Sequence, residues 1–450
     1  MIELYYTLLM LCICIGMYFY SKSIPVVLFS LYSASWFFPQ GITLYFLNIE
    51  LNPLIGFFEF IFVLSNIKVI IGTTNTLKIP ITTLLIYIIC ILSLYLIVAC
   101  FSTKVEFYTQ LLSIKSIILI FLNIFMVLFF KQESDFKKYI KFIIFLTFFS
   151  GIYSIYTYII GSNPVGDIVA HYIKKFESQG LGGNYINTHR GFLKGRIMGF
   201  TVHPLMFGGV VALFSMLILQ QRLIVSNVKE KTFCLLYLFF LLILILLTGS
   251  RSVIIGVLFG MLYLFSQYYH KKFFGAMIIS FLFIVVGNIT IDDVFLKSII
   301  YFWNEDSDVS GSSYGMRTIQ LEACLDEIDK DITSWLFGLG HEWSNHYLSI
   351  NGNRPPFQGF ESILFVKIVN TGLLGTVLYF IFVYYPIVKL VNKYVYDKLE
   401  RKFIISFMIC GLTISLMTGD YYGYRLYLVL IFFFLKYYLI RYSKRISIQL

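Results

Sequence analysis

Three arginines and one glutamate stand out in this sequence because of where they lie relative to its long apolar runs. Arg196 and Arg251 each stand at the start of such a run. Arg317 lies in the longest polar segment, and Glu361 begins the apolar run that follows it. A guanidinium fork binds phosphate oxygens through two hydrogen bonds and stays charged at any working pH, and a carboxylate can accept a proton as a general base. Together these residues predict a site that binds a diphosphate and activates a hydroxyl group.

Each of the four also has a simpler explanation. An arginine beside an apolar run, such as Arg196, can be an interfacial anchor whose charge reaches water. Arg317 could belong to the solvated face of a loop helix, and Glu361 could simply pair with an arginine. Arg251 favours a function, because a charge in the almost loop-free turn Leu247-Thr-Gly-Ser-Arg-Ser252 is costly unless it is paired or functional. A helix break in that turn would also present backbone N–H groups to an anion.

Histidines supply a second set of candidates. His346 precedes Glu361 in the polar segment and is the alternative general base, and His203 and His341 are secondary candidates. The stretch His341-Glu-Trp-Ser-Asn-His346 lacks the His-Glu-x-x-His spacing of zinc proteases, and the cysteines form no Cys-x-x-Cys pair. We therefore expect neither a metal site nor a cofactor.

The composition is that of a polytopic membrane protein. Of 450 residues, 58% are hydrophobic and only 13% are charged, against roughly 25% charged in soluble domains. Backbone polar groups in a membrane must be satisfied within each segment, so we expect an all-α fold of about 12–13 transmembrane helices. The expected spans are residues 4–20, 24–38, 53–71, 79–101, 111–130, 139–160, 197–219, 233–247, 252–269, 273–289, 360–388, 403–417 and 424–440.

Basic loops set the predicted orientation, because excess Lys and Arg mark the cytoplasmic side. The basic segments are residues 131–138, 222–231, 270–272, 389–402 and 441–445. Residues 161–196 and 291–359 then form two extracytoplasmic loops, the larger between the tenth and eleventh spans. We expect residues 1–450 to form one integral domain of the cytoplasmic membrane, with its catalytic loops outside. The net charge of +11 gathers in the loops, so no nucleic-acid partner is expected.

Taken in order, these motifs resemble those of the O-antigen ligase and O-antigen polymerase superfamily of bacterial membrane glycosyltransferases. Gly195-Arg-Ile-Met-Gly-Phe200 looks like the family's Arg-x-x-Gly entry to a span, and Thr248-Gly-Ser-Arg251 looks like its Ser-Arg turn. Arg317 ahead of Phe337-Gly-Leu-Gly340 resembles the loop arginine that precedes a Gly-x-Gly. Thr371-Gly-Leu-Leu-Gly375 resembles the end of the family's helix that begins with a polar residue, here Glu361.

The resemblance implies a GT-C-like membrane fold and a metal-independent, inverting transfer of a glycan from undecaprenyl diphosphate. In that reaction Arg196, Arg251 and Arg317 would bind the diphosphate, and Glu361 or His346 would act as the base. Ligases of the family usually carry a histidine at the position of Glu361. This departure favours a polymerase over a ligase.

The leading hypothesis is a polymerase that joins lipid-linked oligosaccharide repeat units into O-antigen, capsular polysaccharide or exopolysaccharide. A ligase that moves finished glycan to a lipid or protein acceptor is the first alternative. A non-enzymatic flippase of lipid-linked glycans is the second, and it is disfavoured because a flippase would line the whole transmembrane path with charge. The expected partners are the undecaprenyl-diphosphate-linked glycan, a glycan acceptor and membrane lipid, with chain-length regulator and flippase proteins as further candidates.

Overall fold

The computed structural model describes residues 2–38, 43–45, 49–66, 81–102, 104–165, 195–201, 203–265, 314–351, 356–357, 360–419 and 423–449. In the N-terminal half the helices are α1 (Ile2–Ser21), α2 (Ile24–Ser35), α3 (Leu51–Ser65), α6 (Ile81–Phe101), α7 (Phe107–Leu128), α8 (Glu133–Ile160) and α11 (Pro204–Ile224). In the C-terminal half they are α12 (Val228–Leu247), α13 (Arg251–Phe265), α16 (Tyr314–Ile328), α17 (Ile332–Phe337), α18 (Trp343–Asn351), α19 (Ile363–Tyr394), α20 (Lys398–Thr418) and α21 (Gly423–Gln449). The strands β1 (Thr43–Leu44) and β2 (Ile49–Glu50) form a short antiparallel pair in which Thr43 faces Glu50.

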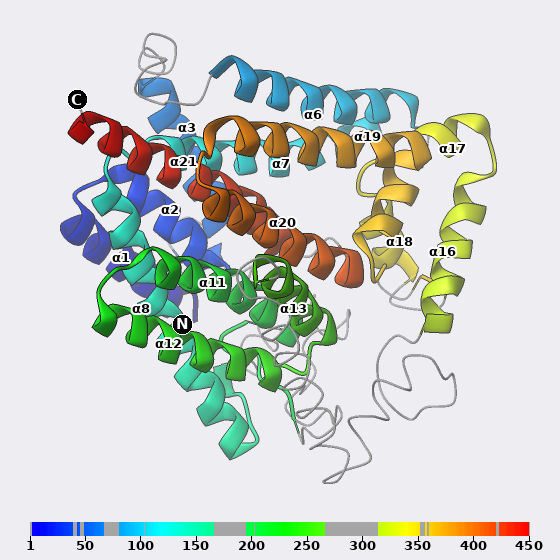
Figure 1. The fold of residues 1–450 in the computed structure, drawn as a ribbon. Coiled ribbons are helices and arrows are strands. Elements are labelled where there is room, and N and C mark those ends of the chain that lie inside the picture. Colours follow the sequence, from blue (N-terminus) through cyan, green and yellow to red (C-terminus); the bar gives the residue numbers. More distant parts are fainter. Residues whose placement is uncertain are drawn as a thin grey trace.

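Every predicted span that falls within the described residues coincides with a helix (Figure 1). By length and composition, six described helices could cross a membrane, namely α1, α8, α11, α12, α19 and α20. Shorter apolar helices, including α2 and α13, lie among them. The chain is therefore an all-α polytopic membrane protein, as predicted. The predicted span 273–289, and most of the loop 161–196, lie outside the described residues.

One predicted boundary is wrong. The apolar pattern suggested a span that begins at Ile197, but α11 begins at Pro204. Proline suits the first turn of a helix because its missing N–H would have no partner there. His203 caps the helix, with its Nδ1 accepting a hydrogen bond from the Leu205 N–H at 3.1 Å. Arg196 and His203 therefore lie on an irregular segment ahead of α11, and not two turns apart along it.

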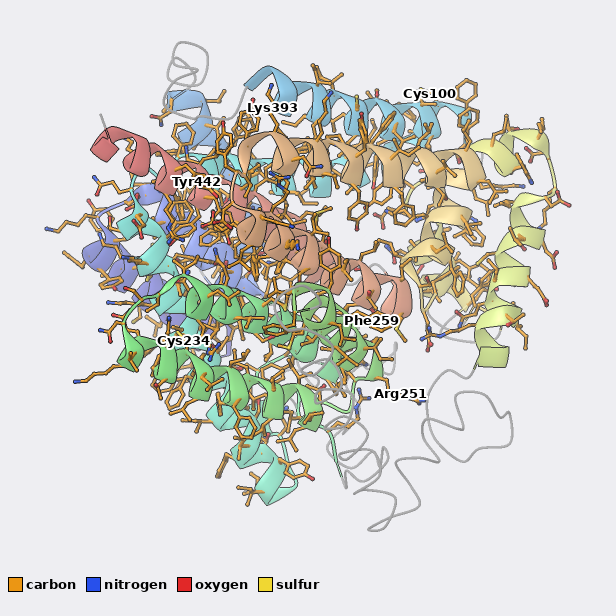
Figure 2. All side chains as sticks on the ribbon, in the orientation of Figure 1. Cys100, Cys234, Arg251, Phe259, Lys393 and Tyr442 are labelled. Atoms are coloured by element: carbon orange, nitrogen blue, oxygen red, sulfur yellow. The ribbon has the colours of Figure 1, made fainter. Side chains whose placement is uncertain are left out.

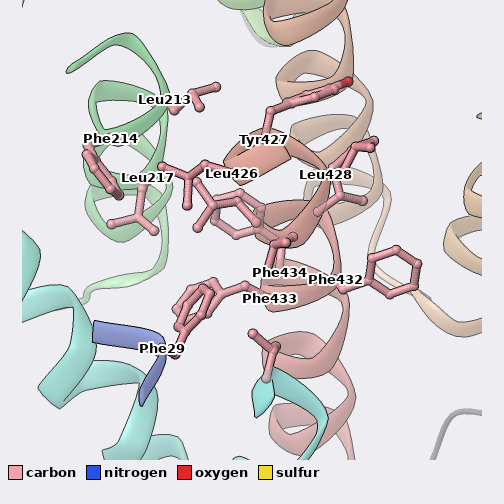
Figure 3. Packing of buried hydrophobic residues seen from close by; sticks show 14 of the residues in the cluster. Phe29, Leu213, Phe214, Leu217, Leu426, Tyr427, Leu428, Phe432, Phe433 and Phe434 are labelled. Atoms are coloured by element: carbon pink, nitrogen blue, oxygen red, sulfur yellow. The ribbon is translucent and has the colours of Figure 1, made fainter. Parts of the chain in front are cut away.

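Helix α21 runs through the centre of the helical bundle. Its residues from Leu426 to Leu435 are each at most 6% exposed. A helix that is apolar on every face is expected to be enclosed by others. Figure 3 shows how these side chains pack between α11 and α2, where Phe433 stacks on Phe29 with ring centroids 6.1 Å apart. The core thus forms around the C-terminal helix.

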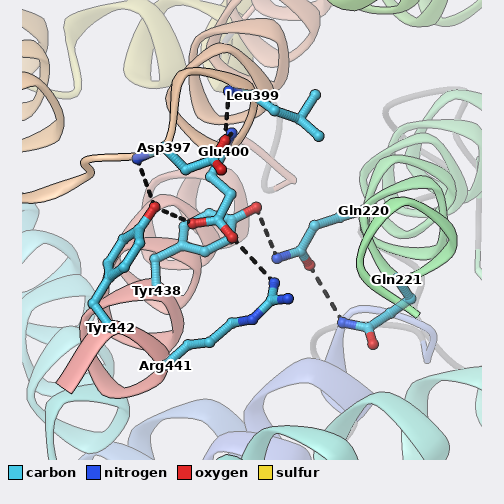
Figure 4. Close-up of polar contacts among 8 residues, drawn as sticks. All are labelled: Gln220, Gln221, Asp397, Leu399, Glu400, Tyr438, Arg441 and Tyr442. Atoms are coloured by element: carbon cyan, nitrogen blue, oxygen red, sulfur yellow. Dashed lines mark hydrogen bonds and ion pairs between the residues drawn. The ribbon is translucent and has the colours of Figure 1, made fainter. Parts of the chain in front are cut away.

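A polar network closes one end of the bundle (Figure 4). Glu400, at the start of α20, accepts hydrogen bonds from Arg441 Nη1 at 3.0 Å and from the Tyr442 hydroxyl at 2.5 Å. The Tyr438 hydroxyl accepts a hydrogen bond from Gln220 Nε2 at 3.0 Å. These contacts join the start of α20 to the C-terminal parts of α21 and α11.

The basic segments that fall within the described residues gather at this same end. Lys138 Nζ donates to the Ser21 carbonyl at 3.0 Å, so the turn between α1 and α2 lies beside the basic turn between α7 and α8. In Figure 2, Lys393 and Tyr442 lie toward this end of the bundle, whereas Arg251 lies at the other. Helices α16, α17 and α18 stand at the end opposite the C-terminus (Figure 1). The candidate site residues are therefore separated from the basic loops by the length of the helices.

Candidate functional site

Arg196 is buried against the turn between α12 and α13. Its Nε donates to the Thr248 carbonyl at 2.8 Å, and its Nη2 donates to Ser250 Oγ at 3.1 Å. The next residue along the chain, Ile197, donates its N–H to the Leu247 carbonyl at 3.2 Å. Arg196 is only 5% exposed, so it supports the turn that presents Arg251.

A tight turn follows Arg196 and fixes its direction. Gly199 has a φ of +57°, and a Cβ at this position would lie 2.7 Å from the Phe207 ring. Only glycine adopts this conformation and fits the space without strain. The Thr201 hydroxyl donates to the carbonyls of Met198 and His203, at 2.7 and 3.0 Å, and completes the turn. In this structure His203 caps α11 through its Nδ1.

Arg251 is placed by the close packing of α13 against α20. A Cβ on Gly256 would lie 2.9 Å from the Cys410 carbonyl oxygen, and a Cβ on Gly260 would lie 3.0 Å from the Ser406 carbonyl oxygen. These pairs show that the two helices run antiparallel with their backbones nearly in contact. Arg251 precedes Gly256 by about one and a half helical turns. In the same antiparallel register, it therefore lies level with the last turn of α20.

Arg317 reaches that last turn of α20 from the opposite direction. Its Nη2 donates to the Met417 carbonyl at 2.9 Å, and this is one of the terminal carbonyls that a helix leaves without an internal partner. The same nitrogen lies 4.0 Å from Glu361 Oε2. Burial lowers the pKa of Arg317 and the Glu361 carboxylate opposes that shift, yet a guanidinium remains charged in proteins. The end of α20 thus brings Arg317 and Glu361 together.

The predicted span 360–388 would place Glu361 inside a helix. In the structure Glu361 lies just ahead of α19 instead. The helix begins at Ile363, after Ser362, whose hydroxyl accepts a hydrogen bond from the Leu364 N–H at 3.2 Å. The Glu361 N–H donates to Gln320 Oε1 at 3.3 Å. A carboxylate beside a helix N-terminus is favoured by the helix dipole. The Glu361 side chain is 34% exposed, so its carboxylate remains accessible.

The segment that carries Glu361 also touches the end of α20 directly. Gly419 has a φ of +86°, and a Cβ there would lie 2.6 Å from the Phe360 carbonyl oxygen. Phe360 itself has a φ of +51°, a conformation that is uncommon for a bulky residue. The close approach of Phe360 to Gly419 holds Glu361 near the end of α20. Arg317 donates to the Met417 carbonyl at this same end.

A second glycine pair fixes the large loop to α19. Helix α19 is broken at Gly372, which has a φ of +68°, and Gly338 has a φ of +76°. A Cβ on Gly338 would lie 2.5 Å from the Gly372 nitrogen. The break frees two helix carbonyls, and these accept hydrogen bonds from the loop, Val369 from the Leu339 N–H at 2.7 Å and Asn370 from the Gly340 N–H at 3.2 Å. The loop is therefore attached through its backbone.

His341 continues this attachment and is enclosed. Its ring stacks on Tyr95 of α6 with centroids 4.1 Å apart, and its Nε2 lies 3.1 Å from the Tyr95 carbonyl oxygen. Its N–H donates to Gln110 Oε1 at 3.2 Å. Burial, with a smaller contribution from Lys367, lowers the pKa of His341 to about 3. These surroundings give His341 a packing role and make it a poor proton acceptor near neutral pH.

His346 lies on the exposed side of α18. On the same helix, Trp343 and Tyr347 pack instead toward Phe357, with ring centroids 6.0 and 4.8 Å away. Helix α18 is fixed by Asn370, whose Oδ1 accepts from the Ser344 N–H at 3.0 Å. The contacts of α18 therefore hold the helix firmly but leave the His346 side chain outside the cluster of Arg317 and Glu361.

In the part of the chain that the structure describes, no three His, Cys, Asp or Glu side chains are grouped so as to hold a metal ion. Arginines supply the cationic groups around the last turn of α20 instead. Arg251 stands at the N-terminus of α13, and a helix N-terminus attracts anions through its backbone N–H groups. Arg317 stands at the C-terminus of α20, where a cation is favoured. The arrangement can bind an anionic group next to the Glu361 carboxylate.

Comparison with known proteins identifies the region that carries this arrangement. The family model described as O-antigen ligase matches residues 236–380. The chain carries an O-antigen ligase family domain. This match confirms the resemblance to the O-antigen ligase and O-antigen polymerase superfamily. No curated protein and no solved structure matches the chain.

The O-antigen ligase domain includes Arg251, Arg317 and Glu361. Arg196 and His203 precede it, and the contacts of Arg196 with the turn at 248–250 connect that segment to the domain. Helix α20, whose last turn joins these groups, follows the domain. The candidate site therefore involves packing of the family domain against the irregular segment that carries Arg196 and against α20.

Sequence reasoning did not single out Gln320, although Gln320 contacts Glu361 directly. The available signal was its position three residues after Arg317 on a predicted helix, because residues three apart share a face. The contact of Arg317 with the Met417 carbonyl could not be predicted from the sequence, because every residue type has a backbone carbonyl.

Proposed function

We propose that this protein joins undecaprenyl-diphosphate-linked oligosaccharide repeat units into a polysaccharide such as O-antigen, capsule or exopolysaccharide. The observation that carries the proposal is the pairing of Arg317 with Glu361 at the end of α20, within an O-antigen ligase family domain. This pairing supplies a cation for the diphosphate and a carboxylate for proton transfer within one contact distance.

In the proposed reaction, a sugar hydroxyl of the acceptor attacks the anomeric carbon of the lipid-linked donor from the face opposite the diphosphate. The new C–O bond forms while the bond between the anomeric carbon and the diphosphate oxygen breaks. The bonding electron pair leaves with undecaprenyl diphosphate, and Glu361 takes the hydroxyl proton. The anomeric configuration is therefore inverted.

The arginines neutralise the charge that develops on the departing diphosphate. Arg317 and Arg251 approach the end of α20 from α16 and α13, and Arg196 holds the turn that carries Arg251. Charge-assisted hydrogen bonds from guanidinium groups are roughly twice as strong as neutral ones. Their placement before the reaction begins lowers the cost of separating charge.

We propose that this chemistry needs no metal ion, because the arginines supply the positive charge. The test is polymerisation by the purified protein from lipid-linked repeat units in the presence of EDTA. Unchanged chain formation is expected. Inhibition by EDTA that is reversed by Mg²⁺ or Mn²⁺ would show that a cation takes part.

The site is proposed to face the outside of the cytoplasmic membrane. The described basic segments lie at the opposite end of the helices from Arg251 (Figure 2), and excess positive charge marks the cytoplasmic side. A cysteine placed in the basic turn between α11 and α12 should resist a membrane-impermeant thiol reagent in intact cells. Labelling at that turn would reverse the orientation.

Transfer of finished glycan to a lipid or protein acceptor is the second candidate, favoured by the description of the matching family as O-antigen ligase. The glycan banding pattern of a deletion strain separates the two. A polymerase predicts loss of long chains while a single repeat unit remains attached to its acceptor. A ligase predicts long chains that accumulate unattached.

A further inference from the structure

One buried side chain next to the candidate site has a hydrogen-bonding group without a partner. Gln320 is 0% exposed and lies one turn after Arg317 on α16. Its Oε1 accepts the Glu361 N–H at 3.3 Å, while its Nε2 is buried and has no hydrogen-bond partner among the residues that the structure describes. The Glu361 N–H is a donor, so it fixes which end of the amide is the oxygen. The NH₂ group must therefore point elsewhere.

A second glutamine shows what the same arrangement looks like when it is satisfied. Gln110, at the start of α7, is also 0% exposed, and its Oε1 accepts a backbone N–H, that of His341, at 3.2 Å. Its Nε2 donates to the Val105 carbonyl at 2.9 Å. Both glutamines hold a loop residue through the same backbone contact, but the amide nitrogen is used at Gln110 and unused at Gln320.

An unused buried donor is costly and uncommon in native proteins, and it is often retained where a ligand completes the contact. Arg317 lies one turn before Gln320 on α16, and the Glu361 backbone contacts the Gln320 amide oxygen. The side chains of Arg317 and Glu361 are 21% and 34% exposed. Their 4.0 Å contact is loose for an ion pair. A ligand that inserts between these two side chains would lie beside the turn of α16 that carries Gln320.

We propose that the Gln320 NH₂ group donates a hydrogen bond to a diphosphate oxygen of the lipid-linked substrate. This inference rests on the proposed function, since Arg317 supplies the charge that brings the diphosphate to the amide. Gln320 then serves two purposes: its oxygen holds the Glu361 backbone in place, and its nitrogen contacts the leaving group. The diphosphate is bound by one guanidinium and one amide from successive turns of α16.

The test is the affinity of the purified full-length protein for undecaprenyl diphosphate, which carries no sugar. Gln320→Met removes donor and acceptor with little change in volume. Gln320→Glu keeps an acceptor for the Glu361 N–H but removes the donor. We expect both substitutions to weaken binding about tenfold to a hundredfold, the usual range for one hydrogen bond to a charged group.

Gln110→Met is the matched control, because it removes a buried glutamine that holds a backbone N–H away from the site. It should lower the Tm at least as much as Gln320→Met while changing the affinity less than about twofold. If Gln320→Met fails to fold, unchanged affinity of Gln320→Glu still rules the inference out, because this variant preserves the contact with Glu361 and its added charge can only weaken the binding of a neighbouring diphosphate.

Three results would overturn the inference. Affinity within about twofold of wild type for Gln320→Glu would show that Gln320 acts only through the Glu361 backbone. A loss confined to lipid-linked repeat units, with undecaprenyl diphosphate bound normally, would assign the contact to a sugar oxygen instead. A wild-type protein that does not bind undecaprenyl diphosphate at all would overturn the proposed function together with this inference.

Discussion

The guanidinium of Arg317 and the carboxylate of Glu361 lie 4.0 Å apart, each projecting from a different element beside the last turn of α20. The contact is partly exposed, and an exposed ion pair adds little to stability, typically about 0–1 kcal/mol. Stability alone therefore does not account for this contact. Under the proposed function, the guanidinium would stabilise the departing diphosphate and the carboxylate would accept the hydroxyl proton.

Replacement of Arg317 or Arg251 by lysine is expected to impair activity strongly although the charge is kept. Lysine loses the fork that binds two phosphate oxygens. The loss of one charge-assisted hydrogen bond, roughly 1.5–3 kcal/mol, corresponds to about a tenfold to hundredfold lower rate. Chain formation by purified variants measures this effect, with membrane content and Tm as controls. Near-normal rates for both variants would show that only the charge matters.

Arg196→Lys should behave differently from the other two arginine variants. Arg196 is buried and donates to both Thr248 and Ser250, so lysine cannot reproduce both contacts. We expect a lower Tm together with lower activity, because the turn that presents Arg251 is no longer held. A variant with a wild-type Tm and a tenfold loss of activity would instead place Arg196 in contact with substrate.

Alanine at Gly338 or Gly372 should release the large loop from α19. Each glycine has a positive φ and touches the backbone of the other segment. The left-handed conformation alone costs a non-glycine residue about 1–2 kcal/mol, and the steric clash adds to it. Both variants are expected to lower the Tm and the activity.

Gly209→Ala is the control for these variants, because a Cβ at that position meets nothing within 4 Å. Helix propensity predicts that it is neutral or slightly stabilising, by up to about 1 kcal/mol. Equal losses of stability for Gly209→Ala and Gly338→Ala would remove the support for a specific contact between the loop and α19.

His341 predicts a pH dependence of stability. Burial lowers its pKa to about 3 from the ordinary value of 6.5, so only the unfolded state takes up a proton as the pH falls below about 6.5. Stability should therefore decrease as the pH falls from 7.5 to 5, by about 1–2 kcal/mol from this residue. His341→Phe keeps a ring to stack on Tyr95 and should show a smaller change of Tm between these pH values. An equal change in both proteins would mean that other groups cause it.

Much of the fold could be predicted from hydrophobicity, because a polar backbone cannot enter a membrane except as a helix. The turn at Thr248–Ser250 and the loop helix around Arg317 were also predictable, since glycine, serine and charge interrupt apolar runs there. The beginning of α11 was misplaced because Ile197 and Met198 are apolar yet lie in a buried turn. Apolar residues that pack without forming a helix look like part of a span.

The neighbours of each site residue could not be predicted, because they depend on packing between distant elements. Nothing in the residue types of Gly419 or Met417 indicates that α20 ends between Arg317 and Glu361. The same holds for His341, which looked like a catalytic candidate until its ring was found stacked on Tyr95. Motif order indicated the region of the candidate site, and the tertiary contacts distinguish the partly exposed Glu361 from the enclosed His341.

The central claim is that Glu361 accepts the proton in glycosyl transfer, and polymerisation by the purified Glu361→Gln protein tests it most directly. The amide preserves the shape of the side chain but cannot act as a base, and general base catalysis contributes about 10²–10⁴-fold. We predict that Glu361→Gln lowers the transfer rate at least about a hundredfold while its Tm and its binding of undecaprenyl diphosphate persist. His346→Ala, measured alongside, should form chains of near-normal length. Near-normal chains from Glu361→Gln, together with their loss in His346→Ala, would contradict the account and identify His346 as the base.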